Sequence, residues 1–148
     1  MSYIDHNLLS NETVLYRAHL SRIVFAFPVL MLGIALVLPV LGGAAMGLGV
    51  VLGAVALGYL VKAWIAYKTS EFAVTNKRVI MKVGWIRRAS VEIVLGRVES
   101  IVVDQGIAGR VFDFGSIAVV GTGGTKDPFH RIAAPLRFRR AVQEQLAA

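Results

Sequence analysis

The chain has 148 residues, no cysteine and a formal net charge of +7, with 16 Lys and Arg residues against 9 Asp and Glu. This length accommodates one modest globular domain with a membrane anchor, but not two full domains. Without cysteine the chain has no disulfide framework, no thiolate metal site and no cysteine nucleophile.

The positive charge is concentrated in the C-terminal part of the chain. Residues 1–22 hold two cations and two anions, whereas residues 62–148 hold 14 Lys and Arg residues against 7 Asp and Glu. We interpret residues 1–22 as a short cytoplasmic segment, residues 23–65 as a two-helix transmembrane hairpin and residues 69–148 as a basic cytoplasmic domain.

An uncharged stretch covers the 39 residues from 23 to 61. A membrane-spanning helix needs about 20 apolar residues, so this stretch predicts two spans. Pro39 and the glycines at 42 and 43 place the turn, which gives spans of about residues 22–41 and 44–65. A cleaved signal peptide is the alternative for the first span, but acidic residues precede it and the apolar run is too long.

Charged and aromatic residues predict how the hairpin is oriented. The flanking cations are Arg17, Arg22, Lys62 and Lys68. The aromatic residues at the same ends are Tyr16, Phe25, Phe27, Tyr59, Trp64 and Tyr67. Cytoplasmic flanks carry excess Lys and Arg, and aromatic residues favour the membrane interface. We therefore expect both termini in the cytoplasm and the hairpin in a bacterial inner membrane.

Small residues occur on more than one face of the second span, and they allow close helix contact. They are Gly47, Gly49, Gly53, Ala54 and Gly58. Packing against the first span is the simpler explanation, and packing against a partner helix is the alternative.

After residue 68, short runs of β-branched residues are separated by glycine, asparagine and charged clusters. This pattern predicts a small antiparallel β fold. The expected strands cover residues 71–75, 78–83, 89–95, 100–105, 116–120 and 129–133. Apolar residues at 107, 108, 111 and 112 recur at one-turn spacing and predict a short helix that caps the sheet. Pro135 begins an amphipathic C-terminal helix.

Four stretches carry a family resemblance: SNETVLYRAHLSR, FAVTNKRVIMKVG, LGRVESIVVDQGIAGRVFDFGSIAVVG and PLRFRRAVQEQL. Their most specific positions are Thr75-Asn76-Lys77-Arg78, Gly84, Gln105, Gly109-Arg110 and Gly115. In this order around a membrane hairpin, they resemble the bacterial membrane-anchored pleckstrin-homology-like (PH-like) proteins. The resemblance implies a partly open β-barrel of six or seven antiparallel strands with one C-terminal α-helix.

Catalytic patterns are weak throughout the chain. The three histidines lack metal-ligand spacing, and the glycines at 121–124 lack the spacing of a phosphate-binding loop. We therefore expect no enzyme activity, no catalytic residue, no metal and no cofactor. We also expect no nucleic-acid binding, because a recognition helix, a stacking platform and a dense basic stripe are missing.

Basic residues near the span exits predict contact with anionic lipid, to which each cation contributes about 1 kcal/mol. The candidates are Arg17, Arg22, Lys62, Lys68, Lys77, Arg78, Trp85, Arg87 and Arg88. The alternative is that Trp85 covers the sheet while the arginines are solvated.

Arg137, Arg139 and Arg140 on the terminal helix are candidates for contact with a protein partner. The leading hypothesis is a non-enzymatic inner-membrane adaptor or accessory subunit that presents the PH-like domain to a membrane protein, a membrane complex or a second copy. The alternative is a module that senses anionic membrane lipids.

Overall fold

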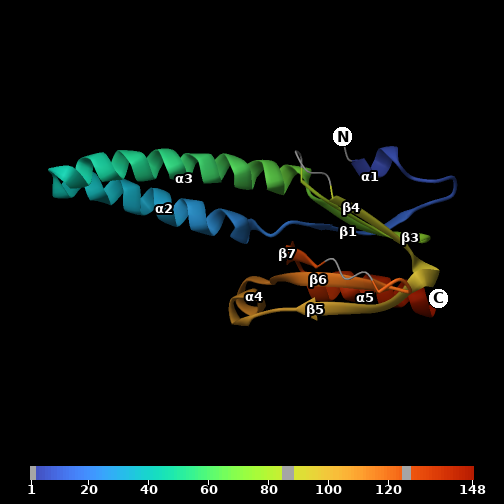
Figure 1. Cartoon of the computed structure of the whole chain (residues 1–148). Coiled ribbons are helices and arrows are strands. Elements are labelled where there is room, and N and C mark those ends of the chain that lie inside the picture. The colour runs from blue at the N-terminus through green and yellow to red at the C-terminus, as the bar shows by residue number, and fades with distance from the viewer. Residues whose placement is uncertain (1–2, 85–88, 125–127) are drawn as a thin grey trace.

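The computed structural model of the chain describes residues 3–84, 89–124 and 128–148. An apolar helical hairpin projects from a head that contains two antiparallel β-sheets (Figure 1). The first sheet has the order β1-β2-β3-β4, formed by Val14–His19, Glu71–Thr75, Arg78–Val83 and Ala89–Val94. The second sheet has the order β5-β6-β7, formed by Val98–Asp104, Phe114–Gly121 and Phe129–Ala133.

The hairpin consists of two helical runs. The first joins the 3-10 turn η1 (Arg22–Phe25), α2 (Ala26–Val37) and the 3-10 turn η2 (Leu38–Leu41), and the second is α3 (Ala44–Thr69). Both runs are long and apolar enough to cross a membrane. Only 17% and 11% of their most apolar windows are buried, so they differ from the core helices of a soluble protein. The first run has the predicted bounds, and α3 continues past the predicted end.

Gly49 limits the distance between the hairpin helices. A Cβ atom at Gly49 would lie 2.9 Å from the carbonyl oxygen of Ala35, so no larger residue fits without a shift of α2. At Gly53 the same atom would make an ordinary 3.7 Å contact with the Ala35 methyl group. The other predicted packing residues, Gly47, Ala54 and Gly58, are exposed.

Strand β1 precedes the hairpin in the chain, and β2 follows it directly. The two strands pair antiparallel, with Tyr16 opposite Val74 and His19 opposite Glu71. The whole hairpin is therefore inserted between two neighbouring strands of one sheet. No sequence pattern predicted β1.

A buried ion pair attaches the N-terminal segment to the β2–β3 turn. The side chain of Glu12 is 0% exposed and that of Arg78 is 14% exposed. The Glu12 carboxylate accepts hydrogen bonds from Arg78 Nε at 2.9 Å, from Thr75 Oγ1 at 2.7 Å and from the Leu9 N–H at 2.7 Å. Burial raises the pKa of Glu12, but these hydrogen bonds outweigh it and bring the pKa below its ordinary value. We call these four residues the Glu12 clasp.

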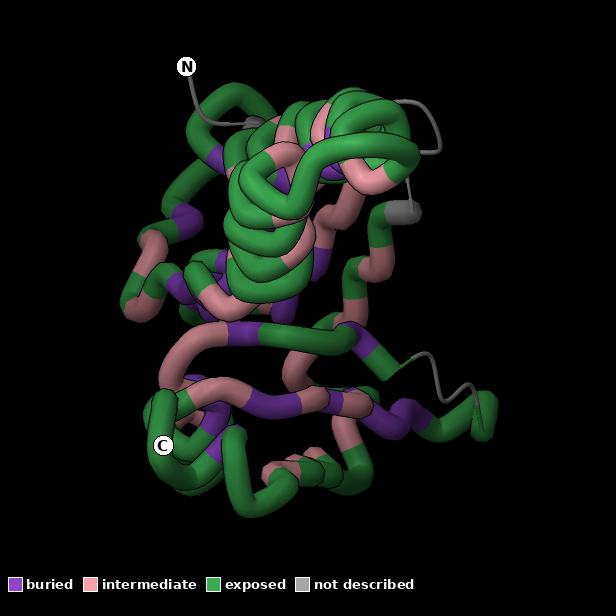
Figure 2. The backbone as a smooth tube through the Cα atoms, turned by 90° about the vertical axis from the view of Figure 1, so that its left-hand side faces the viewer, coloured by how far each residue is buried: buried purple, intermediate pink, exposed green. Residues whose placement is uncertain are grey.

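The hydrophobic core lies between the two sheets, where buried residues gather in Figure 2. Phe72 from the first sheet and Ile117 and Ile132 from the second are fully buried. The helix α5 (Pro135–Ala147) closes this core with Phe138. On the outer face of the first sheet, the short helix α1 (Tyr3–His6) buries Ile4.

The described strands form two separate sheets linked by the 3-10 turn η3 (Leu95–Arg97), so the barrel is partly open. These sheets, the C-terminal helix and the apolar hairpin confirm the predicted fold class. The short helix α4 (Ile107–Phe112) is also present, but its predicted role as a cap is wrong. Ile107, Val111 and Phe112 are 86%, 72% and 63% exposed, because α4 turns these side chains away from the sheet.

Candidate membrane-proximal site

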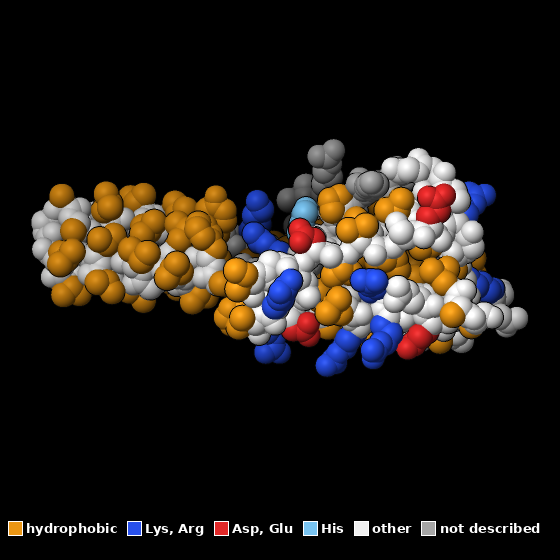
Figure 3. Space-filling model, turned by 90° about the horizontal axis from the view of Figure 1, so that it is seen from below, with side chains coloured by type: hydrophobic (Ala, Val, Ile, Leu, Met, Phe, Trp, Pro, Cys, Tyr) orange, Lys and Arg blue, Asp and Glu red, His pale blue; other side chains and the backbone are white. Residues whose placement is uncertain are grey.

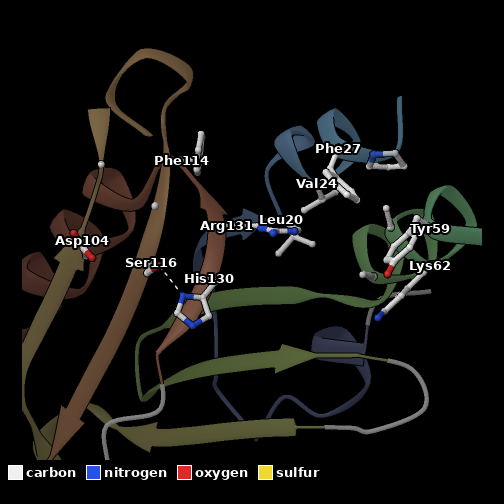
Figure 4. Close-up of a pocket in the computed structure, with 15 residues that line it drawn as sticks. Leu20, Val24, Phe27, Tyr59, Lys62, Asp104, Phe114, Ser116, His130 and Arg131 are labelled. Atoms are coloured by element: carbon white, nitrogen blue, oxygen red, sulfur yellow. Dashed lines mark hydrogen bonds between the residues drawn. The ribbon is translucent and has the colours of Figure 1, made fainter. Parts of the chain in front are cut away.

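A crevice of about 960 Å³ lies where the hairpin meets the second sheet (Figure 4). Phe27 of α2 and Tyr59 and Lys62 of α3 stand on the hairpin side. The sheet side carries Asp104, Phe114, Ser116, His130 and Arg131. The crevice therefore combines apolar surface from the hairpin with polar groups from the head.

The crevice forms because the short link between β1 and the hairpin is attached to β7 of the second sheet. Leu20 makes a β-bridge with Ile132, and the Ser21 N–H donates to the carbonyl oxygen of Arg131 at 2.6 Å. The Ser21 hydroxyl accepts a hydrogen bond from the Ile23 N–H at 3.4 Å at the start of η1. These contacts hold the base of the first helical run against β7.

Two cations approach the crevice from opposite walls. Lys62 is exposed on α3, and Arg131 is exposed on β7. In Figure 4, the side chain of Arg131 points toward Leu20 and the start of the hairpin. Arg131 has a φ of 60°, a left-handed conformation that is uncommon outside glycine. Among the described residues that line the crevice, Asp104 is the one acidic residue, so cations predominate there.

A hydrogen-bonded pair adds neutral polar groups to the sheet wall. Ser116 Oγ and His130 Nδ1 lie 2.8 Å apart. A serine nucleophile needs a histidine base that a third group orients. Among the described residues, no acidic side chain hydrogen-bonds to His130, and no group of three potential metal ligands occurs. This arrangement suits hydrogen bonding to a ligand better than nucleophilic attack.

Aromatic pairs connect the two hairpin helices beside the crevice. The ring centroids of Phe25 and Tyr67 are 5.6 Å apart, and those of Phe27 and Tyr59 are 5.9 Å apart. Tyr59 is 47% exposed and lies one helical turn from Lys62. A tyrosine ring next to a lysine amine is typical of helix ends at a membrane–water interface.

The sequence profile of the bacterial PH domain matches residues 23–146, which is most of the chain. The chain belongs to the bacterial PH domain family. The matched region includes the hairpin and both sheets except β1, which precedes it. No curated protein and no solved structure matches the chain. PH-like domains mediate protein or lipid interactions.

The predicted lipid-facing cations of this bacterial PH domain do not form one surface. Arg22, Lys62 and Lys68 are exposed at the base of the hairpin. Arg17 lies on β1 and pairs with Asp5. Trp85, Arg87 and Arg88 lie outside the described residues, so their predicted role stays a prediction.

The remaining two cations lie at the end of the first sheet that is remote from α3, where Lys77 is in the β2–β3 turn and Arg78 begins β3 (Figure 1). Lys77 Nζ donates to the carbonyl oxygen of Ser10 at 2.6 Å. Arg78 belongs to the Glu12 clasp and also donates to Glu92 at 2.6 Å. Both side chains thus make contacts within the head.

The predicted interfacial aromatic residues also lie in different parts of the molecule. Tyr16 packs against Phe138 in the head, with ring centroids 6.3 Å apart, and burial raises the pKa of its hydroxyl group. Trp64 is 57% exposed on α3. The candidates for protein contact, Arg137, Arg139 and Arg140, are exposed on α5, and their role stays a prediction.

The residues of the sheet wall lie far apart in the sequence and meet through strand pairing. The register of β5 with β6 places Asp104 opposite Ser116, and β7 adds His130 and Arg131. No spacing in the sequence links positions that meet only through strand pairing. Arg131 is the one residue of the sheet wall with a relevant sequence signal, because it is a cation in the last predicted strand of a basic domain.

Proposed function

We propose that this bacterial PH domain protein is a non-enzymatic membrane-surface module. In this proposal, α2 and α3 span the bacterial inner membrane and both chain termini lie in the cytoplasm. The crevice between the hairpin and the second sheet binds the headgroup of an anionic lipid.

The pairing of β1 with β2 supports the proposed membrane arrangement. A strand pair cannot form across a lipid bilayer, so β1 and β2 must lie on the same side of it. Two crossings by α2 and α3 satisfy this requirement. Cleavage after the first span, as in a signal peptide, would remove β1 from the sheet. Arg22, Lys62 and Lys68 at the head end favour the cytoplasmic side.

The position and charge of the crevice carry the proposed lipid function. The crevice lies where the apolar hairpin ends and the polar head begins, which is the depth of lipid headgroups if the hairpin spans the bilayer. Lys62 and Arg131 stand on opposite walls, so a bound phosphate would have a cation on either side. Phe27 and Tyr59 offer apolar surface to the attached acyl chains. This geometry favours lipid binding over the adaptor role.

Competition between phosphatidylglycerol and phosphatidylcholine for the full chain tests the proposal. With about 1 kcal/mol from each cation, Lys62→Gln combined with Arg131→Gln lowers the preference for the anionic lipid about 30-fold. Native mass spectrometry of the detergent-solubilised chain measures the lipid retained. Arg139→Gln on α5 is the matched control and leaves the preference unchanged. An equal preference in the double variant and the unmodified chain would contradict the proposal.

The adaptor role is a second candidate, because the described sheets have open edges. β4 and β5 are outer strands, and an outer strand can pair with an extended segment of another protein. Val102 on β5 is 52% exposed. Attachment to the membrane would raise the local concentration of the domain near such a partner or a second copy. Val102→Lys is expected to abolish strand addition and leave lipid retention unchanged.

A further inference from the structure

The helix α4 presents apolar side chains to the outside of the head. Ile107, Val111 and Phe112 are 86%, 72% and 63% exposed, and Arg110 between them is exposed as well. In contrast, Gly109 is buried. Three large apolar residues on one short helix therefore lack cover from the described part of the head.

The local structure holds α4 in this orientation. A Cβ atom at Gly109 would overlap the carbonyl oxygen of Phe114, so only glycine allows the helix to lie this close to β6. The Gln105 side chain donates to the same carbonyl oxygen at 3.2 Å. A Cβ atom at Gly115 would lie 2.6 Å from the carbonyl oxygen of Asp104, so the strands beneath α4 are equally close. The close contacts of Gln105, Gly109 and Gly115 thus fix the position of α4 on the second sheet. All three residues belong to the family resemblance.

α4 lies at the end of the second sheet that faces the hairpin (Figure 1). Phe112 lines a groove of about 350 Å³ together with Arg22, Ile23 and Val29 at the base of the first helical run. Figure 3 shows apolar side chains on the head next to the hairpin, with Lys and Arg side chains around them. The exposed face of α4 is therefore continuous with the start of the apolar helices.

We infer that α4 inserts Ile107, Val111 and Phe112 into the boundary between headgroups and acyl chains of the membrane that holds the hairpin. Interfacial helices bury their apolar face about 5–10 Å into the boundary between headgroups and acyl chains. Arg110 would then lie at the level of the lipid phosphates. The head would contact the membrane at two places, which are the hairpin exits and α4. This inference rests on the proposed membrane insertion of the hairpin, but not on lipid binding in the crevice.

A bilayer suits this face better than a protein partner does. Stable protein interfaces bury about 800 Å² on each partner and involve about 20–30 residues. α4 has 6 residues, and only three of them offer a large apolar side chain. Membrane insertion needs no complementary surface, and the hairpin already brings α4 close to the lipid.

The absence of cysteine allows a direct test with spin labels. Full-length single-cysteine variants Val111→Cys and Phe112→Cys are labelled with a nitroxide and placed in nanodiscs that contain phosphatidylglycerol and one chain per disc. Thr122→Cys is the matched control, because Thr122 is exposed just beyond the opposite end of β6. Accessibility is measured with oxygen, which enters lipid, and with a water-soluble nickel chelate.

We expect oxygen to relax the labels at positions 111 and 112 more strongly than the nickel chelate does, with the opposite result at 122. Equal nickel accessibility at all three positions would overturn the inference. A second set of discs holds two chains each. Protection of positions 111 and 112 from the nickel chelate in these discs alone would also overturn the inference, because a second copy would then cover α4. Native folding of each variant is confirmed by circular dichroism. Loss of lipid preference at the crevice does not change these outcomes, so the two proposals fail separately.

Discussion

Removal of the Arg78 side-chain charge tests how firmly the N-terminal segment is attached to the head. Arg78→Met keeps an unbranched apolar stem but removes the guanidinium group, which leaves Glu12 without its cation. The Glu12 side chain is 0% exposed, and within the described part of the chain it would keep the hydrogen bonds from Thr75 and from the Leu9 N–H. A buried carboxylate without a counterion is strongly destabilising, because water cannot solvate it.

The burial of the two partners sets the expected magnitude. Breaking a buried ion pair by removal of one partner costs about 3–5 kcal/mol. Arg17→Met is the matched control, because the side chains of Arg17 and Asp5 are 38% and 51% exposed. Exposed pairs contribute about 0–1 kcal/mol. The two arginine variants are therefore expected to differ in their free energy of unfolding by at least 2 kcal/mol.

Denaturant unfolding of the full chain in detergent micelles, followed by near-ultraviolet circular dichroism, measures this difference. The double variant Glu12→Gln/Arg78→Met is expected to recover part of the loss, because it no longer buries an unpaired charge. Equal destabilisation by Arg78→Met and Arg17→Met would refute the role of the Glu12 clasp.

Three further outcomes are expected from the contacts of Gly109, Gly49 and Glu12. Gly109→Ala is expected to destabilise the head by about 1–3 kcal/mol, because the added methyl group overlaps a carbonyl oxygen of β6. Gly106→Ala is the control in the same unfolding assay, because its methyl group meets open space among the described residues. Gly49→Leu is expected to separate the hairpin helices, and Gly47→Leu to leave them in place, as measured by the distance between spin labels on the two helices. The pKa of Glu12 is lowered from 4.5 on folding, so its stabilising contribution is present above pH 4.5 and is lost as the pH falls below that value. The free energy of unfolding of Glu12→Gln, measured at several pH values, is therefore expected to approach that of the unmodified chain in acid.

Sequence patterns predicted the elements whose signal is local. The uncharged stretch contains its own turn signal, and the first helical run begins and ends at the expected residues. Three strands, Glu71–Thr75, Arg78–Val83 and Phe129–Ala133, have the predicted bounds. The first two contain several β-branched residues on either side of a turn, so their strand propensity agrees with their tertiary environment.

Strand β1 shows where local pattern was insufficient. Tyr16 and Ala18 point toward the core, but Leu15 on the opposite face is also apolar and is 49% exposed. The period-two alternation that indicates a half-buried strand is therefore weak. The partner of β1 lies more than 50 residues further along the chain, beyond the whole hairpin. Nothing near Val14 in the sequence indicates that pairing.

Charge placement could not be predicted for a similar reason. Lys77 and Arg78 were expected at the membrane because they follow the second span closely in the sequence. A strand of five residues, β2, carries the chain about 16 Å away from α3 before the turn. The pairing of Arg78 with Glu12 also depends on the N-terminal segment lying beside this turn, and sequence proximity cannot show that.

The central claim is that the hairpin crosses the membrane twice and leaves β1 and the PH domain together in the cytoplasm. Labelling with a membrane-impermeant thiol reagent in spheroplasts tests it most directly, because the natural chain has no cysteine. The variants are Val40→Cys in the turn of the hairpin, Thr13→Cys before β1 and Thr122→Cys in the head. We predict that Val40→Cys reacts in intact spheroplasts and that the other two react only after lysis. Labelling of Thr13→Cys or Thr122→Cys in intact spheroplasts would contradict the claim.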